Sequence, residues 1–317
     1  MSFKKYNSIE NHYHEGTIEK WFNMFPELRK VLWVAQEKLD GSNISILIDK
    51  YDVTLFSRNR KLGSDEDFYG IRTLLGQNEY QDLLKTLKDL SVDNNAVYRI
   101  YGEIFGKDIQ KRINYGNEKY FRVFDFEIDD RRLSPTELLE FFKLNNLYYY
   151  LVPFIKIGYY EQLVRLDVNS MKSRFALERG IESPIEGIVL KPYNKVYYTR
   201  LGQIIYVKYK SDKFKEITKV KRFKKFNGNP DVKKLNNKFK EYINENRVLS
   251  IFSKEGKIEE YKDIGKYIKL ILEDAKKDFL KNLTEEEKGI LNTLSKSDER
   301  QVYNVGSKIA NLLKMYL

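Results

Sequence analysis

The sequence contains no cysteine and little histidine, which excludes several kinds of site. Its 317 residues include no cysteine, two histidines and six prolines. Without thiols the chain has no disulfide, no thiolate metal site and no cysteine nucleophile. His12 and His14 leave little scope for histidine catalysis. A protein of this composition is expected in a reducing compartment, the cytoplasm, or the host cytoplasm if the source is viral.

Long apolar runs are missing as well. None approaches the roughly 18 residues that a membrane-spanning helix needs. The first residues, Met1-Ser2-Phe3-Lys4-Lys5, are followed by no apolar signal core. We therefore expect a soluble protein with no membrane partner.

Basic residues, in contrast, are abundant. Lysine and arginine number 57 against 46 acidic residues, which gives a formal charge of +11. Such a balance favours polyanionic partners such as nucleic acid, although lysine used only for solubility produces the same numbers. The length of the chain predicts two domains.

The first two thirds of the chain read as strands with a few helices. Runs of β-branched and aromatic residues predict strands at residues 31–35, 44–49, 53–57, 96–101, 120–128, 185–191 and 204–210. Helical spacing is found over 74–90, and the cluster Asp65-Glu66-Asp67 suits a helix start. Ser134-Pro135-Thr136-Glu137 combines an N-cap, a proline at the first helical position and a glutamate at the third, which predicts a helix through Leu144.

The pattern changes at Gly228-Asn229-Pro230. Before it, nine basic residues between Lys208 and Lys225 face only Asp212 and Glu216. Beyond it the strand pattern disappears, apolar residues recur at helical spacing, and Thr284-Glu285-Glu286-Glu287 forms a capping box. We predict an α+β fold in which an antiparallel-sheet domain, residues 1–228, is followed by a small all-α domain, residues 229–317.

Several charged residues lie on or beside the predicted strands. Attack on the α-phosphate of a nucleoside triphosphate needs a nucleophile, a divalent metal held by carboxylates, and cations that neutralise the phosphates. A lysine is a nucleophile only as the neutral amine, which burial or neighbouring cations favour. These requirements are met by Lys38 as nucleophile, Glu103 and Glu186 as carboxylates, and Arg58, Lys208 and Lys210 as cations.

The motif around Lys38 points to a known family. Lys38-Leu39-Asp40-Gly41 resembles the K-x-D/H-G signature of the covalent nucleotidyltransferases, which include ATP-dependent ligases and capping guanylyltransferases. Further motifs follow in that family's order between residues 33 and 216: Ser57-Arg58, Tyr101-Gly102-Glu103-Ile104-Phe105-Gly106, Val123-Phe124-Asp125-Phe126, Glu186-Gly187-Ile188-Val189-Leu190-Lys191 and Val207-Lys208-Tyr209-Lys210.

Other segments resemble the RNA ligase 2 class, whose members seal nicks in double-stranded RNA. They include Glu10-Asn11-His12-Tyr13, Glu66-Asp67-Phe68-Tyr69-Gly70 and Ser211-Asp212-Lys213-Phe214-Lys215-Glu216. The helical C-terminal part agrees with that class, because DNA ligases and capping enzymes continue with an OB barrel, which reads as short alternating strands.

The resemblance implies a nucleotidyltransferase domain that uses ATP with Mg²⁺ or Mn²⁺. The resemblance implies that Lys38 takes up AMP, that Glu37 and Asn43 flank the nucleotide, and that Phe124 stacks on adenine. It also implies that Arg58 binds ribose or phosphate, that Glu103 and Glu186 act at the ribose and the metal, and that Lys208 and Lys210 contact the ATP phosphates. Lys191 would belong to the nucleotide site, and Arg247 would serve in sealing. The expected partner is RNA, in the form of a nicked duplex, and the expected role is RNA repair by a monomer.

Two departures leave alternatives open. Asp40 stands where some members of the class have histidine, and Gln36 stands where an arginine is often found. An ATP-dependent DNA ligase or a capping guanylyltransferase would retain the chemistry with another substrate. A catalytically inactive RNA-binding protein on a ligase scaffold would bind RNA without forming lysyl-AMP.

Overall fold

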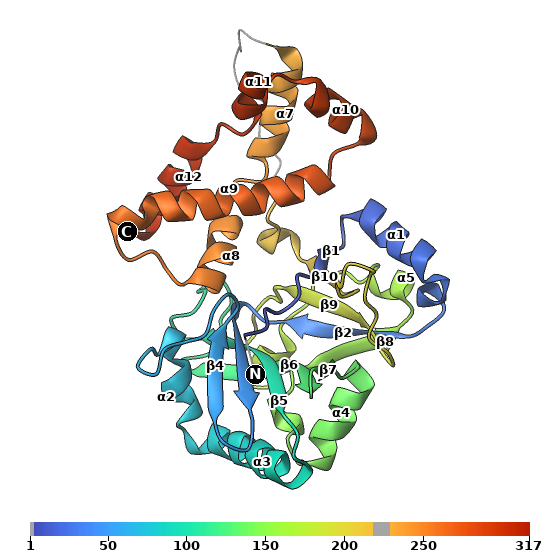
Figure 1. The fold of residues 1–317 in the computed structure, drawn as a ribbon, viewed down its shortest axis with the longest axis vertical. Coiled ribbons are helices and arrows are strands. Elements are labelled where there is room, and N and C mark those ends of the chain that lie inside the picture. Colours follow the sequence, from blue (N-terminus) through green and yellow to red (C-terminus); the bar gives the residue numbers. More distant parts are fainter. Residues whose placement is uncertain (1–2, 218–228) are drawn as a thin grey trace. The chain divides into compact units, whose positions relative to one another are not determined.

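The computed structural model describes residues 3–217 and 229–317. The chain divides into two compact units, Met1–Lys213 and Phe214–Leu317 (Figure 1). The boundary expected between residues 228 and 229 falls at the edge of a segment outside the described residues, and it stays a prediction. Five of the nine basic residues between Lys208 and Lys225 also lie outside them.

The first unit contains two five-stranded sheets. Sheet A has the order β1 (Glu10–Asn11), β10 (Val207–Lys210), β9 (Gly187–Pro192), β2 (Trp33–Lys38) and β8 (Phe154–Gly158). Sheet B has the order β4 (Val53–Ser57), β3 (Gly41–Ile48), β5 (Tyr98–Gly106), β6 (Lys119–Ile128) and β7 (Arg131–Arg132). Neighbouring strands are antiparallel except for the parallel pair of β1 and β10, so the predicted α+β class is confirmed.

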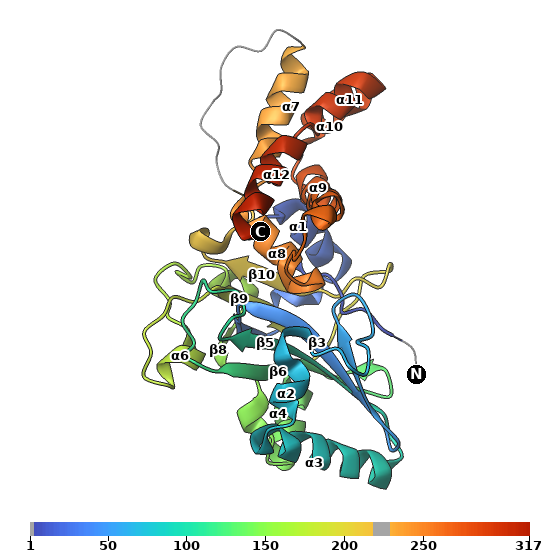
Figure 2. The same ribbon diagram turned by 90° about the vertical axis from the view of Figure 1, so that its left-hand side faces the viewer.

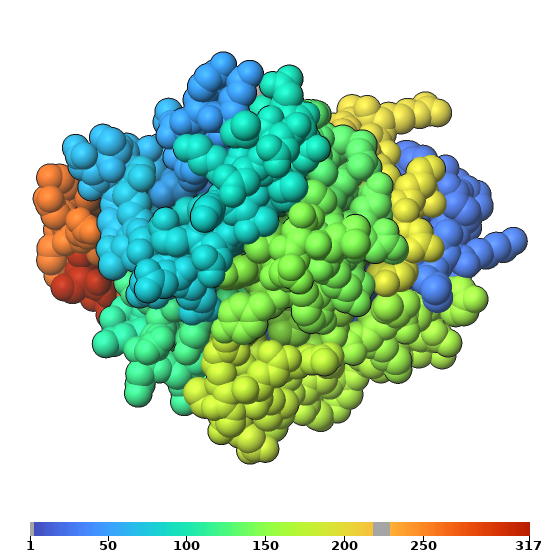
Figure 3. Space-filling view, turned by 90° about the horizontal axis from the view of Figure 1, so that it is seen from below, coloured from blue at the N-terminus to red at the C-terminus, as the bar shows by residue number. Residues whose placement is uncertain are grey.

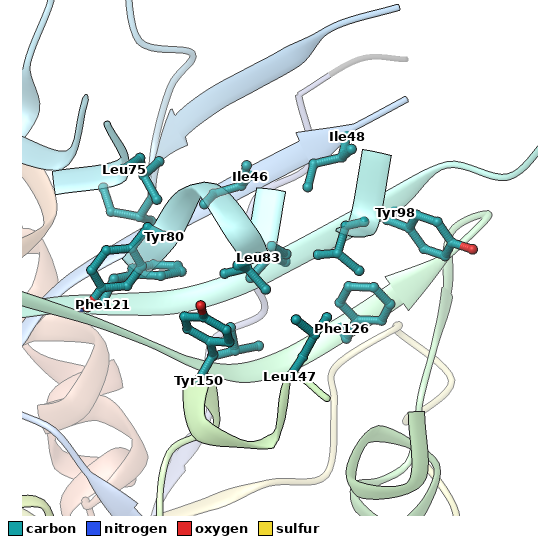
Figure 4. Packing of buried hydrophobic residues seen from close by; sticks show 14 of the residues in the cluster. Ile46, Ile48, Leu75, Tyr80, Leu83, Tyr98, Phe121, Phe126, Leu147 and Tyr150 are labelled. Atoms are coloured by element: carbon teal, nitrogen blue, oxygen red, sulfur yellow. The ribbon is translucent and has the colours of Figure 1, made fainter. Parts of the chain in front are cut away.

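Helices cover the outer face of sheet B. The first unit contains α1 (Glu15–Met24), α2 (Ile71–Leu75), α3 (Asn78–Asn94), α4 (Pro135–Leu144), α5 (Tyr160–Leu163) and α6 (Arg174–Leu177). Figure 2 shows α2, α3 and α4 along one side of sheet B, and Figure 3 shows this side with α3 in cyan and α4 in green. In Figure 4, Tyr80 and Leu83 of α3 lie among Ile46 of β3 and Phe121 and Phe126 of β6. Burial of these apolar side chains stabilises the layer.

A second core lies on the outer face of sheet A. It combines Trp21 and Phe22 of α1, Leu163 of α5, and Trp33 and Ala35 of β2. Because successive strand residues point to opposite faces, the alternate residues of β2 lie on the face of the sheet away from this core. Those residues include Lys38.

The second unit is helical throughout its described part. Its helices are α7 (Pro230–Lys240), α8 (Glu245–Glu255), α9 (Ile264–Lys281), α10 (Glu285–Thr293), α11 (Lys296–Val302) and α12 (Gly306–Leu313). They enclose a core of their own. Both predicted capping boxes are present, with Ser134 and Glu137 at α4 and with Thr284 and Glu287 at α10. No helix of the described part has the length and apolar character needed to cross a bilayer.

Two local predictions need correction, and strand β8 was not predicted. The helix predicted over 74–90 is two helices, α2 and α3, separated at Gly76-Gln77. After the cluster at residues 65–67 the chain first forms a 3₁₀ turn, Phe68–Gly70, in which Gly70 has a left-handed φ of 83°. Strand β8, Phe154–Gly158, was not predicted, because Pro153 precedes it and its side chains do not alternate between buried and exposed.

Candidate active site

Lys38 meets its carboxylate partner through the register of sheet A. Lys38 pairs with Gly187 of β9, and Gly187 pairs with Lys210 of β10, so the two lysines lie in one row across three strands. Glu186 precedes that glycine. Its Oε2 accepts a hydrogen bond from Lys38 Nζ at 2.8 Å, and its Oε1 lies 3.1 Å from Lys210 Nζ. Lys208 follows in the next row on the same face.

The two glutamates predicted to act together have opposite electrostatic environments. Burial would raise the pKa of Glu186, but Lys38, Lys210 and Arg112 outweigh burial and lower it to about 2. Burial raises the pKa of Glu103 to about 8, with Glu186 adding to this effect and Lys38 opposing it. At neutral pH Glu186 is therefore ionised and Glu103 is largely protonated.

These carboxylates fit a divalent cation by their chemistry. Glu103 and Glu186 offer the hard oxygen donors that Mg²⁺ and Mn²⁺ take, whereas both carboxylate oxygens of Asp40 contact Arg112. Burial is the main cause of the raised pKa of Glu103, and the nearby carboxylates of Glu186 and Asp40 add to it; a divalent cation would offset that added repulsion. Within the described residues no cluster of three or more metal-binding side chains is already arranged around one point.

Asn43 and Glu37 have different positions relative to Lys38. Asn43 of β3 lies opposite Glu103 in the register of sheet B, so these two are brought together. Glu37 lies on the other face of β2, where its carboxylate accepts hydrogen bonds from Ser173 Oγ at 2.5 Å and from the Phe175 N–H at 3.0 Å. Burial raises the pKa of Glu37 to about 7, against the effect of these hydrogen bonds.

Lys191 joins the two sheets beside Phe124. Its buried Nζ donates to the Phe124 carbonyl at 2.7 Å and to Asp125 Oδ1 at 2.8 Å. Burial lowers the pKa of Lys191, and Asp125 opposes the shift. The Phe124 ring is partly exposed and meets Tyr6 edge-on at 5.1 Å. The Phe124 ring thus packs against Tyr6 while the residue stays partly exposed.

Arg58 and Arg247 occupy contrasting sites. Arg58 follows β4 and acts electrostatically on Glu103, which places it near the site. Arg247, in the helical unit, is 0% exposed, donates to the Tyr242 carbonyl at 2.8 Å and to Asp278 at 2.9 Å, and also contacts Asp274. In this structure Arg247 supports the helical core, and its role in sealing stays a prediction.

The structure gives roles to two residues, Arg112 and Tyr115, to which the sequence patterns assigned none. Arg112 Nε donates to Asp40 Oδ2 at 3.0 Å, and a second contact makes the ion pair bidentate. The Tyr115 hydroxyl accepts from the Asp40 N–H at 2.9 Å. Burial raises the pKa of Asp40 to about 6, Glu186 adds to the shift and Arg112 opposes it. Asp40 belongs to the Lys38 motif, but nothing in the local sequence indicates that Arg112, 72 residues further along, is its partner.

Comparison with known proteins agrees with this geometry. The family described as RNA ligase matches residues 31–221, and the family described as T4 RNA ligase 2 C-terminal matches residues 226–311. The Protein Early 65 kDa of Autographa californica nuclear polyhedrosis virus is 30% identical over 201 residues, which are 59% of this chain and 31% of that protein. The chain thus spans less than a third of the length of this relative.

Solved structures of Naegleria gruberi RNA ligase are similar at a lower level. An apo mutant has a TM-score of 0.48 and 18% identity, and the match covers 67% of this chain and 56% of that one. A mutant with ATP and Mn has a TM-score of 0.48 and 19% identity, over 67% and 57% of the two chains. The RNA ligase family match extends over more than half of the sequence, includes Lys38, Glu103, Glu186 and Lys210, and confirms the resemblance seen in the motifs. The chain therefore belongs to the RNA ligase family.

Proposed function

We propose that the chain is an ATP-dependent RNA ligase that joins 5′-phosphate and 3′-hydroxyl ends at nicks in duplex RNA through a lysyl-AMP intermediate. The observation that carries the proposal is the cluster of Lys38, Glu186 and Lys210, in which the carboxylate of Glu186 contacts the Nζ atoms of both lysines. A role in RNA repair, action as a monomer and a cytoplasmic location belong to the same proposal.

In the first step Lys38 Nζ, after losing a proton, attacks the α-phosphorus of ATP. The new N–P bond forms as the bond to the bridging oxygen breaks, and pyrophosphate leaves with the electron pair. Glu186 holds the amine in place, and Lys208 and Lys210 offset the negative charge of the phosphates. A divalent cation held by Glu103 and Glu186 would supply further neutralisation of that charge.

The next two steps return the lysine and close the strand. An oxygen of the RNA 5′-phosphate attacks the phosphorus of lysyl-AMP, the P–N bond breaks, and the amine regains a proton. The RNA 3′-hydroxyl then attacks the 5′-phosphate, releases AMP and loses its proton. In each step the cations around Lys38 would neutralise negative charge on the phosphate oxygens, while the phosphorus is the atom attacked.

Labelled ATP tests the mechanism directly. Incubation of the protein with α-labelled ATP and Mg²⁺ should give label that survives denaturation, and Lys38→Ala should give none. Lys50→Ala is the matched control. Lys50 is an exposed lysine just after the end of β3 that is farther from Lys38, and it donates a hydrogen bond to Asn95. An unlabelled wild-type protein, or full labelling of Lys38→Ala, contradicts the proposal.

The choice of substrate separates the proposal from its rivals. GTP in place of ATP as the better donor would indicate a capping guanylyltransferase, and DNA nicks sealed better than RNA nicks would indicate a DNA ligase. An inactive scaffold would bind RNA in a salt-sensitive manner without covalent AMP. A panel of nicked and single-stranded RNA and DNA therefore decides among them.

A further inference from the structure

Gln36 is a buried polar side chain without an explanation in the fold. It is 1% exposed, and neither its amide nitrogen nor its amide oxygen has a hydrogen-bond partner among the described residues. Buried polar groups are nearly always paired, because an unpaired one loses its bonds to water without replacement. Two unpaired polar atoms in the buried side chain of Gln36 are therefore consistent with a ligand that pairs with them.

The strand register places Gln36 on the same face as Lys38. Three successive rows cross sheet A on this face: Lys38 with Gly187 and Lys210, then Gln36 with Val189 and Lys208, then Val34 with Lys191. Directly opposed residues of antiparallel strands share a face. Gln36 thus lies one row from the proposed nucleophile, about 7 Å along the strand.

The third row reaches the proposed adenine platform. Lys191 donates to the Phe124 carbonyl, and its Nζ lies 5.6 Å from the centre of the Phe124 ring. In the proposed function the α-phosphate meets Lys38 and the adenine stacks on Phe124. The sugar that connects them then passes over the middle row, which carries Gln36.

We propose that Gln36 binds a ribose hydroxyl of ATP and thereby selects a ribonucleotide. A hydroxyl both donates and accepts, as a primary amide does, so one group can satisfy both orphan atoms. A phosphate oxygen only accepts and would leave the amide oxygen unpaired. The proposal rests on the proposed function.

A second orphan atom supports the assignment. Asn43 Oδ1, on the facing sheet beside Glu103, is also buried without a hydrogen-bond partner in the described part of the chain. Each of the two sheets thus has a buried amide with an unpaired atom beside a residue of the proposed site, Gln36 on the face that carries Lys38 and Asn43 opposite Glu103. Both amides are shielded from solvent, so nucleotide entry includes a small shift of these side chains.

The variant Gln36→Leu tests the role with two readouts. Leucine has a similar volume and no polar atom, so the thermal midpoint without nucleotide should stay equal or rise. Covalent uptake of AMP at low ATP concentration should fall by about tenfold. Gln77→Leu, in the exposed turn between α2 and α3, is the control for the substitution itself.

Deoxynucleotides identify the contact. Covalent AMP uptake by the wild-type protein should be higher with ATP than with the analogue, 2′-deoxy-ATP or 3′-deoxy-ATP, that lacks the bound hydroxyl. In Gln36→Leu this preference for ATP should be about tenfold smaller. Equal losses with all three nucleotides, no loss at all, or a lower thermal midpoint overturns the inference and makes Gln36 structural. If the wild-type protein takes up no AMP, the proposed function itself fails, which is a separate result.

Discussion

Single residues in this site depend on charges brought from several strands. Glu186 is ionised because Lys38 and Lys210 flank it. Glu103, on β5 of the other sheet, has its pKa raised to about 8 by burial first and by like charges second. A pair of carboxylates with such different affinities for protons is typical of a functional site. It also makes the stability of the fold depend on pH.

Glu103→Gln should reveal that dependence. The pKa of Glu103 is raised in the fold from 4.5 to about 8, so the folded state favours the protonated form. This contribution is complete below the unfolded pKa and is lost as pH rises toward 8. In urea unfolding without nucleotide or divalent cation, the free energy of unfolding of the wild type should fall by about 1–2 kcal/mol relative to the variant between about pH 5 and pH 8. This figure is reduced from the full effect of the pKa shift because the side chain of Glu103 is partly exposed. A difference independent of pH would contradict the assignment.

Arg112→Ala tests the ion pair that the structure added. The change leaves the buried Asp40 without its bidentate partner, and we expect a loss of about 2–3 kcal/mol in the free energy of unfolding. Asp40→Asn combined with Arg112→Ala should recover part of this loss, because the uncompensated charge is gone. The exposed pair of Arg131 and Glu137 is the control, and Arg131→Ala should cost under about 1 kcal/mol. Equal losses from Arg112→Ala and Arg131→Ala would show that the Asp40 ion pair contributes little.

At the scale of elements, the site depends on how closely β9 and β10 approach. A side chain at Gly187 would meet the Tyr209 carbonyl oxygen at 2.3 Å, inside van der Waals contact. The neighbouring positions, Glu186 and Lys210, are the ones that join the two strands to Lys38. Only glycine allows this spacing without moving backbone.

Gly187→Ala should therefore reduce both stability and AMP uptake. We expect a loss of at least about 2 kcal/mol in the free energy of unfolding and a fall in labelling of at least about tenfold, because β10 and Lys210 must move. Gly289→Ala is the matched control, since Gly289 lies in α10 with open space around it and alanine favours a helix. Gly289→Ala should be neutral or stabilising, and an equal effect of the two variants would rule out the steric explanation.

At the scale of the whole molecule, two units with separate cores suggest a division of labour. The residues proposed to form lysyl-AMP all lie in Met1–Lys213, and the helical core of Phe214–Leu317 is built from its own side chains. The basic balance of the chain gives both units a supply of lysines for phosphate contacts.

Removal of residues 231–317 should separate adenylylation from sealing. The shortened protein should take up labelled AMP within about threefold of the full chain, because the cluster around Lys38 is intact. Its sealing of nicked duplex RNA should fall at least about a hundredfold, since the contacts that position RNA are lost. Equal sealing by the two proteins would show that the helical unit is dispensable.

The sequence by itself determined the order of the motifs, the two capping boxes and the helical character of the last 89 residues, 229–317. It placed Lys210 on a strand and Lys38 and Glu103 just beyond strand ends, whereas β2 and β5 extend far enough to include both residues. These features follow from local chemistry: alternation, side-chain caps, and the residue types that a reaction needs. Only the tertiary structure decided that Glu37 faces away from Lys38, that Arg247 is enclosed by carboxylates, and that Arg112 neutralises Asp40. It also left Gln36 unpaired beside the nucleophile. Those outcomes depend on strand register and on residues distant in the chain, and no local pattern encodes which of many possible partners a buried charge or amide meets.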